Sequence, residues 1–275
     1  MSWHSANRPA VRVRSAVLVG VILAAAACTA RGDAKPAQRS AAQTADSIRP
    51  AAQPGEPASS FPSPTRGVAD IVAPRWTNED ARDDAGEFAR VIKLAGIASG
   101  MRVADIGAGD GYYVSRLAPI VGLSGHVYGN DIIHDYLVLL QTRIRREHPG
   151  NVQIVLGDPH DPRLPTGDVD VALMIHMYHE IEQPFGLLWN LATSMKPGGR
   201  LVILDLERKT YSHGTPPALL RCELRAVGYR ELSFTKTGGE EYVAIFEAPS
   251  VSAGVNARPT PAAIRAQLAT SACRG

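Results

Sequence analysis

Residues 103–113, V-A-D-I-G-A-G-D-G-Y-Y, constrain the fold more strongly than any other stretch of the chain. The apolar run that ends near Asp105 is typical of a buried strand in a parallel sheet. Glycine then recurs at every second position, which fits neither a strand interior nor a helix interior and predicts a tight turn. Because glycine has no side chain, its backbone can adopt positive φ and can lie directly against a ligand. The stretch therefore predicts a nucleotide-type binding loop, with a helix beginning near Tyr112.

The spacing of the glycines limits which class of ligand the loop is expected to bind. The dinucleotide fingerprint is G-x-G-x-x-G, whereas this loop is D-x-G-x-G-x-G with an acidic residue at the end of the strand. It resembles motif I of the class I S-adenosylmethionine-dependent methyltransferases. The resemblance covers about residues 77–248. It implies an α/β fold with a Rossmann-like, doubly wound, mostly parallel seven-stranded sheet and a C-terminal antiparallel hairpin.

Acidic residues at the ends of the next two predicted strands agree with this resemblance. Asp131 falls 24 residues after Gly107 (131 − 107 = 24), and an acidic side chain there can accept hydrogen bonds from both ribose hydroxyls. It could also cap the helix that follows, and one carboxylate could serve both purposes. By the resemblance Asp158 approaches the adenine amino group, while the alternative is an ordinary turn residue before Pro159.

The resemblance thus implies S-adenosylmethionine as the cofactor and predicts eight residues that bind it: Asp105, Gly107, Ala108, Gly109, Gly111, Asp131, Ile132 and Asp158. No spacing typical of a zinc site is present, so no metal is expected.

The segment H-M-Y-H-E, residues 176–180, follows a fourth apolar strand. The carboxyl end of such a strand opens onto the ligand crevice of a doubly wound sheet. An imidazole, with a pKa of about 6.5, can accept a proton near neutrality, and His179 matches a histidine that family members often carry here. The candidate catalytic residues are His176, Tyr178, His179 and Glu180, each with a core or capping role as the alternative.

An amphipathic helix is predicted before the first strand. Residues 77–80 have the S/T-x-x-D/E pattern of a helix start, and apolar residues then recur at spacings of three and four up to Ala95. In the family such a helix covers the cofactor cleft, so Trp76, Arg82 and Asp83 could line it. Alternatively, they form only a cap and a solvated face.

The end of the predicted domain argues against a nicotinamide oxidoreductase. Residues 196–199, K-P-G-G, are expected to end a helix before a fifth strand, and two strand-like runs flank Gly238 and Gly239. A terminal antiparallel hairpin on a parallel sheet is the hallmark of the methyltransferase family. Together with the G-x-G-x-G spacing, it disfavours the dinucleotide-binding alternative.

The first 28 residues have the features of an export signal. Arg8, Arg12 and Arg14 precede an uncharged apolar run that ends in A-A-A-C at Cys28. The run of twelve residues is shorter than the roughly 20 that span a bilayer, so cleavage is expected rather than spanning. Cys28 resembles a bacterial lipoprotein acylation site, which would anchor the protein to a membrane. Ordinary signal-peptidase cleavage, giving a soluble exported protein, is an equal alternative.

Composition predicts the remaining boundaries. Residues 29–66 have few large apolar side chains and are expected to be a disordered linker; residues 67–250 form the methyltransferase domain, and residues 251–275 a loosely held tail. A Cys222–Cys273 disulfide is conceivable, but two separate thiols, one semi-buried and one in the tail, are the expected arrangement.

Charge makes nucleic acid an unlikely partner. The chain of 275 residues has a formal charge of +2, but residues 1–66 hold eight Lys/Arg and three Asp/Glu, which leaves 21 against 24, or −3, for residues 67–275. No basic stripe with interleaved aromatic residues is visible.

The sequence therefore predicts an exported enzyme, periplasmic or membrane-anchored, that transfers a methyl group from S-adenosylmethionine to an unidentified, small-molecule acceptor. The alternative is a non-catalytic nucleoside-binding or degenerate protein of the same fold in the cell envelope. Export favours the alternative, because S-adenosylmethionine is made in the cytosol.

Overall fold

The computed structural model describes residues 48–71, 78–147 and 149–273. The predicted signal peptide, Cys28, residues 29–47 of the predicted linker, Trp76, Thr77 and His148 lie outside these residues.

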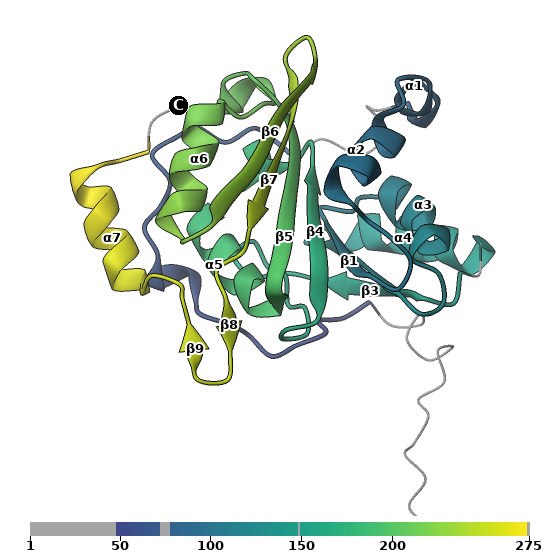
Figure 1. Ribbon diagram of the computed structural model, residues 1–275, viewed down its shortest axis with the longest axis horizontal. Coiled ribbons are helices and arrows are strands. Elements are labelled where there is room, and N and C mark those ends of the chain that lie inside the picture. The colour runs from purple at the N-terminus through teal and green to yellow at the C-terminus, as the bar shows by residue number, and fades with distance from the viewer. Residues whose placement is uncertain (1–47, 72–77, 148, 274–275) are drawn as a thin grey trace, which may run out of the picture. The chain divides into compact units, whose positions relative to one another are not determined.

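A seven-stranded sheet forms the centre of the domain, in the order β3-β2-β1-β4-β5-β7-β6 (Figure 1). The five strands from β3 to β5 are mutually parallel, and β7 is antiparallel to both β5 and β6. The prediction of a mostly parallel sheet with a C-terminal antiparallel hairpin is confirmed. The strands are β1 (Arg102–Ile106), β2 (His126–Asp131), β3 (Val152–Leu156), β4 (Val169–Ile175), β5 (Met195–Leu206), β6 (Arg230–Gly238) and β7 (Glu241–Glu247).

Helices cover both faces of the sheet. They are α1 (Glu79–Asp84), α2 (Glu87–Ala95), α3 (Tyr112–Val121), α4 (His134–Glu147), α5 (Pro184–Ser194), α6 (Pro217–Ala226) and α7 (Pro261–Thr270), with short 3-10 turns η2 (Ala58–Ser60), η4 (Tyr178–Glu180) and η5 (Thr210–Ser212). Successive residues of a strand point to opposite faces, so Val103 joins a core with α2, α3 and α4, while Ala104 joins a core with α5 and α6. The sheet is thereby buried on both sides, as its continuous apolar strands require.

Two predicted element boundaries are wrong. The expected helix before β1 is divided at Gly86, whose φ of 64° lies in the left-handed region, into α1 and α2. Helix α5 ends at Ser194, before the K-P-G-G sequence, because Met195 already pairs with Val169 at the start of the longer strand β5.

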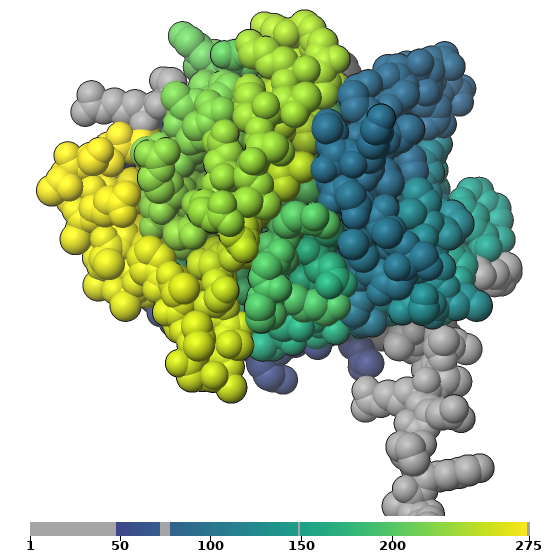
Figure 2. Space-filling view, in the orientation of Figure 1, coloured from purple at the N-terminus to yellow at the C-terminus, as the bar shows by residue number. Residues whose placement is uncertain are grey.

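Helix α2 lies beside strand β7 of the C-terminal hairpin. The Arg90 Nη2 atom is 2.7 Å from Glu241 Oε1 of β7, and Figure 2 shows α1 and α2, in blue, beside the green C-terminal strands. This places the start of the domain next to its last long strands.

Residues 48–66 are not the disordered linker that we predicted. Phe61 is buried beside Trp189, with ring centroids 5.8 Å apart, and Gly55 N donates a hydrogen bond to Asp161 Oδ2 at 2.7 Å. Arg66 Nε lies 2.9 Å from Glu223 Oε1 of α6, and both side chains are buried. One aromatic anchor, one buried ion pair and backbone hydrogen bonds hold a segment whose average composition predicts disorder.

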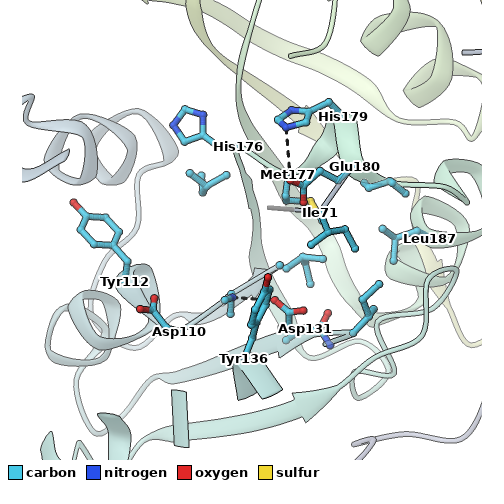
Figure 3. Close-up of a pocket in the computed structure, with 18 of the residues that line it drawn as sticks. Ile71, Asp110, Tyr112, Asp131, Tyr136, His176, Met177, His179, Glu180 and Leu187 are labelled. Atoms are coloured by element: carbon cyan, nitrogen blue, oxygen red, sulfur yellow. Dashed lines mark hydrogen bonds and ion pairs between the residues drawn. The ribbon is translucent and has the colours of Figure 1, made fainter. Parts of the chain in front are cut away.

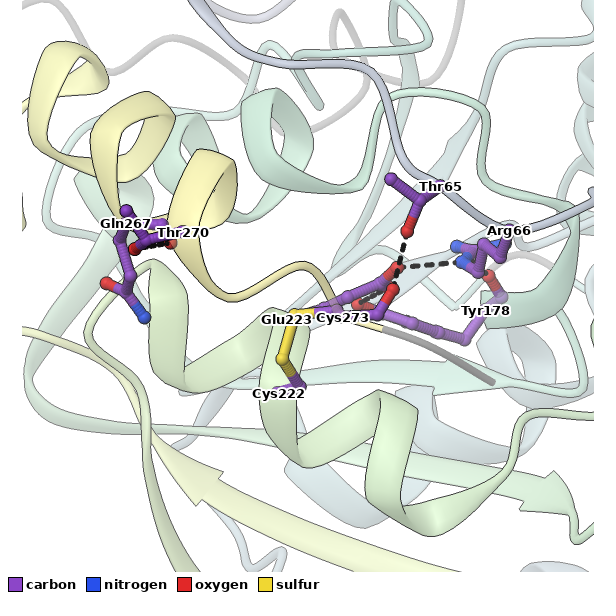
Figure 4. The surroundings of a disulfide bond; sticks show 8 residues. All are labelled: Thr65, Arg66, Tyr178, Cys222, Glu223, Gln267, Thr270 and Cys273. Atoms are coloured by element: carbon purple, nitrogen blue, oxygen red, sulfur yellow. Dashed lines mark hydrogen bonds and ion pairs between the residues drawn. A yellow bond between two sulfur atoms is a disulfide. The ribbon is translucent and has the colours of Figure 1, made fainter.

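The C-terminal residues are also more ordered than we predicted. A short hairpin of β8 (Val251–Ser252) and β9 (Val255–Asn256) precedes α7, whose Ile264 is fully buried. The prediction of separate thiols is wrong, because Cys222 of α6 and Cys273 form a disulfide (Figure 4). Thr65 Oγ1 donates a hydrogen bond to Cys273 O at 2.6 Å, so the N-terminal segment meets the end of the chain here.

Among the described residues, we find no helix with the length and apolar character needed to cross a bilayer.

Candidate active site

A cleft of about 800 Å³ opens at the carboxyl ends of β1, β2 and β4 (Figure 3). Strand order reverses at this point of the sheet, between β1 and β4, which is where open α/β sheets bind ligands. Six of the eight predicted cofactor residues line it: Gly107, Ala108, Gly109, Asp131, Ile132 and Asp158.

The glycine loop is fixed by hydrogen bonds to the end of β2. The backbone N–H groups of Gly107 and Ala108 donate to Asn130 O at 2.8 and 2.9 Å, and Gly109 N donates to Asp131 Oδ2 at 2.9 Å. Gly109 has a φ of 55°, and a side chain there would strain the backbone. At Gly107 and Gly109 the loop therefore presents main chain without a side chain to the cleft.

Asp131 receives a hydrogen bond at the start of α4 and also lines the cleft, while the ribose contact predicted for it remains a prediction. Its Oδ1 accepts a hydrogen bond from Ile133 N at 2.9 Å, at the turn into α4, while its side chain also lines the cleft. Burial raises the pKa of this carboxyl although backbone hydrogen bonds oppose the shift. Each carboxylate oxygen still has a lone pair for a ligand hydroxyl.

Asp105 and Gly111 do not reach the cleft, contrary to our prediction. The Asp105 carboxyl is enclosed behind the loop, where burial raises its pKa to about 7; nearby Arg82 opposes the shift and Asp131 adds to it. Gly111 precedes α3 with a φ of 96°, and a Cβ there would lie 2.3 Å from Leu140 Cδ1. Both residues shape the loop rather than touch the space in front of it.

Asp158 lies at the other side of the cleft, after β3. Its Oδ2 accepts a hydrogen bond from Arg163 Nη1 at 2.6 Å, which holds the carboxylate in place. Ile132 and Tyr136 also line the cleft, Ile132 with an exposed and Tyr136 with a partly exposed side chain. The adenine contact predicted for Asp158 remains a prediction.

The segment after β4 brings three of the four predicted catalytic residues to the cleft: His176, His179 and Glu180. His176 Nε2 lies 3.3 Å from Glu87 Oε2, and His179 Nδ1 lies 3.0 Å from Asp205 Oδ1. Each imidazole is thus backed by a buried carboxylate from another element, α2 in one case and β5 in the other.

Tyr178 is the exception and is wrong as a catalytic candidate. It is fully buried on the other side of the turn, and its hydroxyl donates to Glu223 Oε2 at 2.9 Å. In a 3-10 turn successive side chains point in different directions, so neighbours in sequence need not share a site.

Helix α1 borders the cleft, as the resemblance implied for the helix before β1. Arg82 lines the cleft and its Nη2 contacts Glu87 Oε1 at 2.5 Å. Burial alone would raise the pKa of Glu87, but hydrogen bonds from His176 and Arg82 outweigh it and lower the pKa to about 2. Asp83 accepts a hydrogen bond from Tyr112 at 2.7 Å and does not line the cleft itself.

Sequence reasoning missed several residues of the cleft: Glu79, Asp110, Asn130, Tyr136, Met177, Leu206 and His213. Asp110, Asn130 and Met177 each lie next to a predicted site residue in the sequence, so adjacency could have indicated these three. His213 could not have been found this way, because it comes from the loop after β5.

Comparison with known proteins agrees with the geometry. Residues 104–203 match a protein family described as "Methyltransferase domain". A solved S-adenosylmethionine-dependent methyltransferase from Aquifex aeolicus superposes with a TM-score of 0.56 at 23% identity, over 59% of this chain and 89% of that chain. The fold is that of the class I methyltransferases. The matched segment contains the glycine loop, Asp131 and the residues after β4.

Curated methyltransferases also match part of the chain. The protein-L-isoaspartate O-methyltransferase of Methanothrix thermoacetophila is 30% identical over 118 residues, which are 42% of this chain and 52% of that protein. The ubiquinone/menaquinone biosynthesis C-methyltransferase UbiE of Ectopseudomonas mendocina is 31% identical over 118 residues, 42% of this chain and 46% of that protein. The chain therefore spans about half the length of these curated relatives.

Proposed function

We propose that this chain transfers a methyl group from S-adenosylmethionine to a small-molecule acceptor. The observation that carries the proposal is the cleft at the reversal of strand order, formed by the glycine loop and Asp131 on one side and by His176 and His179 on the other. The methyltransferase-domain match over residues 104–203 supports it.

The residues present fit S-adenosylmethionine. The glycine loop has no side chain to occupy the cleft at Gly107 and Gly109, Asp131 offers carboxylate oxygens to hydroxyls, and Ile132 offers an apolar surface to a base. When bound, S-adenosylmethionine supplies a methyl group already activated on a sulfonium sulfur. The protein's part is to align the acceptor, exclude water and take up a proton.

His176 has the geometry of a proton acceptor. Its Nε2 faces Glu87, so a proton gained on the other ring nitrogen leaves a cation beside a carboxylate that is ionised at neutral pH. The other ring nitrogen then takes the proton that an acceptor hydroxyl or amine loses.

The first experiment is calorimetric titration of the full chain with S-adenosylmethionine, S-adenosylhomocysteine and NAD. Binding of the first two without NAD is the expected result. Gly109→Val, verified as folded by circular dichroism, should weaken S-adenosylmethionine binding by at least tenfold, because the side chain enters the cleft wall. Unchanged affinity in the folded variant would contradict the assignment of the loop.

We also propose that the protein works outside the cytosol. The support is the N-terminal sequence with Cys28 together with the Cys222–Cys273 disulfide, since disulfides persist mainly in oxidising compartments. Mass spectrometry of the mature N-terminal peptide tests this. An acylated Cys28 indicates a membrane-anchored lipoprotein, an unmodified cleaved end indicates a soluble exported protein, and an intact leader contradicts export.

The disulfide supports export, and S-adenosylmethionine is made in the cytosol. Export therefore favours a second candidate function, a binding protein that has the methyltransferase fold but does not transfer methyl groups. A pulse of methyl-labelled S-adenosylmethionine with extracted small molecules separates the two. Formation of S-adenosylhomocysteine only when extract is present supports the enzyme. Tight binding without any product supports the binding protein.

A further inference from the structure

Three potential metal ligands meet at the end of the cleft opposite the glycine loop. His179 and Glu180 lie in η4, after β4, and His213 lies directly after η5, which follows β5. All three line the cleft, and each offers a ligand atom that lies within 4.8 Å of the other two. Because β4 and β5 are neighbouring parallel strands, the loops after them converge at one edge of the sheet.

A buried carboxylate fixes the orientation of His179 within this cluster. The Asp205 side chain is fully buried; its Oδ1 lies 3.0 Å from His179 Nδ1, and its Oδ2 accepts a hydrogen bond from Thr215 Oγ1 at 2.6 Å. With Nδ1 engaged, the other ring nitrogen, Nε2, lies 4.0 Å from Glu180 Oε1. Figure 3 shows these two side chains together at the cleft. Metal-binding histidines commonly donate their second N–H to a carboxylate, which sets the tautomer and makes the ligand nitrogen more basic.

His213 provides a second, independent observation. It is one of three non-glycine residues with positive φ in the described part of the chain, with a φ of 54°, a conformation that strains the backbone of a residue with a side chain. Its Nδ1 is buried and has no hydrogen-bond partner among the described residues. The ring lies edge-on to His179, with centroids 5.5 Å apart. A strained backbone and an unsatisfied buried nitrogen are two costs that a bound cation would offset.

We propose that His179, Glu180 and His213 bind a divalent transition-metal cation, with zinc as the first choice. Two imidazoles and one carboxylate are the donor set of catalytic zinc sites that keep one position open, and nitrogen donors select such ions over magnesium or calcium. Ligands at about 2.1 Å from one ion lie about 3–3.5 Å apart, so a modest movement of the side chains closes the cluster.

The other group of potential ligands, Glu87, His176 and Glu241, is a poorer site for a cation. Glu87 is paired with Arg82, and Glu241 with Arg90. These arginines already neutralise the carboxylates that a cation would need.

The open position faces the cleft, so the cation could bind an acceptor hydroxyl, thiol or carboxylate and lower the pKa of a hydroxyl or thiol. His179 would then be a ligand and His176 the proton acceptor. This role in the reaction rests on the proposed methyl transfer, whereas the metal site does not.

The test is titration of the metal-free full chain with Zn²⁺ alone, without S-adenosylmethionine. One equivalent of tightly bound Zn²⁺ is expected. His213→Ala and Glu180→Gln should each weaken binding by at least 100-fold, and Asp205→Asn by about 10- to 100-fold. The exposed His134→Ala should bind as the unaltered protein does. Lack of stoichiometric binding, or equal affinity in His213→Ala, would overturn the proposal.

Two further measurements keep the outcome clear. X-ray absorption of the unaltered zinc protein should detect two imidazole ligands; a spectrum without them overturns the site even if His213→Ala does not fold. S-adenosylmethionine affinity of the unaltered protein is measured by the same calorimetry. Failure of S-adenosylmethionine to bind the unaltered protein would contradict the proposed function and leave the metal result standing.

Discussion

At the scale of single residues, the cofactor end of the cleft depends on two buried carboxyl groups at the ends of neighbouring strands. Burial is the main cause of the raised pKa of both Asp105 and Asp131. For Asp131, backbone hydrogen bonds from Gly109 and Ile133 partly offset the rise in pKa that burial causes. Ionisation of the buried Asp105 carboxyl costs free energy in the folded state. The contribution of Asp105 to stability therefore depends on pH.

Asp105→Asn should change the pH dependence of unfolding. The pKa of Asp105 is about 7 in the folded chain against 3.8 ordinarily. Between these values the folded state holds a proton that the unfolded state has lost, so this group makes stability fall as pH rises. The shift corresponds to at most about 4 kcal/mol. In urea unfolding at about pH 4 and about pH 8, the variant should lose less stability on going to the higher pH. The exposed Asp135→Asn is the control, and parallel curves for Asp105→Asn and the unaltered protein would contradict the prediction.

Gly111→Ala should destabilise the fold by about 2–4 kcal/mol, from backbone strain plus overpacking against Leu140. The new Cβ would be 2.3 Å from Leu140 Cδ1 at a φ of 96°. Gly198→Ala is a matched control, because its φ is 76° but no atom of the described residues lies within 4 Å of its Cβ position. Chemical denaturation gives the free energy of unfolding of both variants, and the difference between them separates the cost of the contact with Leu140 from the cost of backbone strain. Equal losses in the two would contradict the contact with Leu140.

At the scale of elements, residues 48–66 are attached to α6 and η4 through one buried network. Arg66 pairs with Glu223, and Glu223 also accepts the hydroxyl of Tyr178. Burial raises the pKa of Glu223, and Arg66 and Tyr178 oppose this shift. The N-terminal segment therefore supplies the charge that a buried glutamate of the domain requires.

Arg66→Met should destabilise the protein by about 3–5 kcal/mol, because it leaves Glu223 buried without its partner. Arg66→Met combined with Glu223→Gln should recover part of this loss, since no charge then remains unpaired. Guanidinium unfolding of the single and double variants measures the difference. A double variant that is less stable than Arg66→Met alone would count against the explanation.

The sequence predicted strands and their order better than segments that tertiary contacts hold. Continuous apolar runs identify buried parallel strands locally, and the glycine loop specifies the turn after β1. Nothing local indicated that Phe61 and Arg66 are anchored, because their partners, Trp189 and Glu223, are more than 100 residues away (189 − 61 = 128; 223 − 66 = 157). Average composition therefore gave the wrong answer for residues 48–66.

The same limit applies to the site. The glycine loop and Asp131 belong to one short motif and could be identified, whereas His179 and His213 are 34 residues apart (213 − 179 = 34) and meet only because β4 and β5 are adjacent. Tyr178 was misassigned because a sequence pattern does not specify which way a side chain points from a single 3-10 turn.

At the scale of the whole molecule, contacts join the N-terminal described segment to the C-terminal one. Cys273 is bonded to Cys222 and accepts a hydrogen bond from Thr65 (Figure 4). Arg265 of α7 donates to Ser59 O and Ser60 O at 3.1 and 2.9 Å. The first and last described segments thus cover the same face of the sheet, over α5 and α6.

Cys273→Ser should lower the free energy of unfolding by up to about 4 kcal/mol, the chain-entropy value for the 51-residue separation. Denaturant unfolding under non-reducing conditions measures the loss. Reductant should destabilise the unaltered protein by a similar amount and leave Cys273→Ser unchanged. A variant as stable as the unaltered protein would indicate that the noncovalent contacts alone hold the end of the chain.

This closure has a consequence for how the protein is made. Contacts between residues 57–66 and residues 223–273 close loops of more than 150 residues, and such contacts form late because loop closure is costly. Strands β1, β2 and β3 with α3 and α4 pair over short separations and can assemble early. During synthesis, the half-sheet with the glycine loop can therefore form while α7 is still inside the ribosome, but the domain can be completed only after the whole chain has been released.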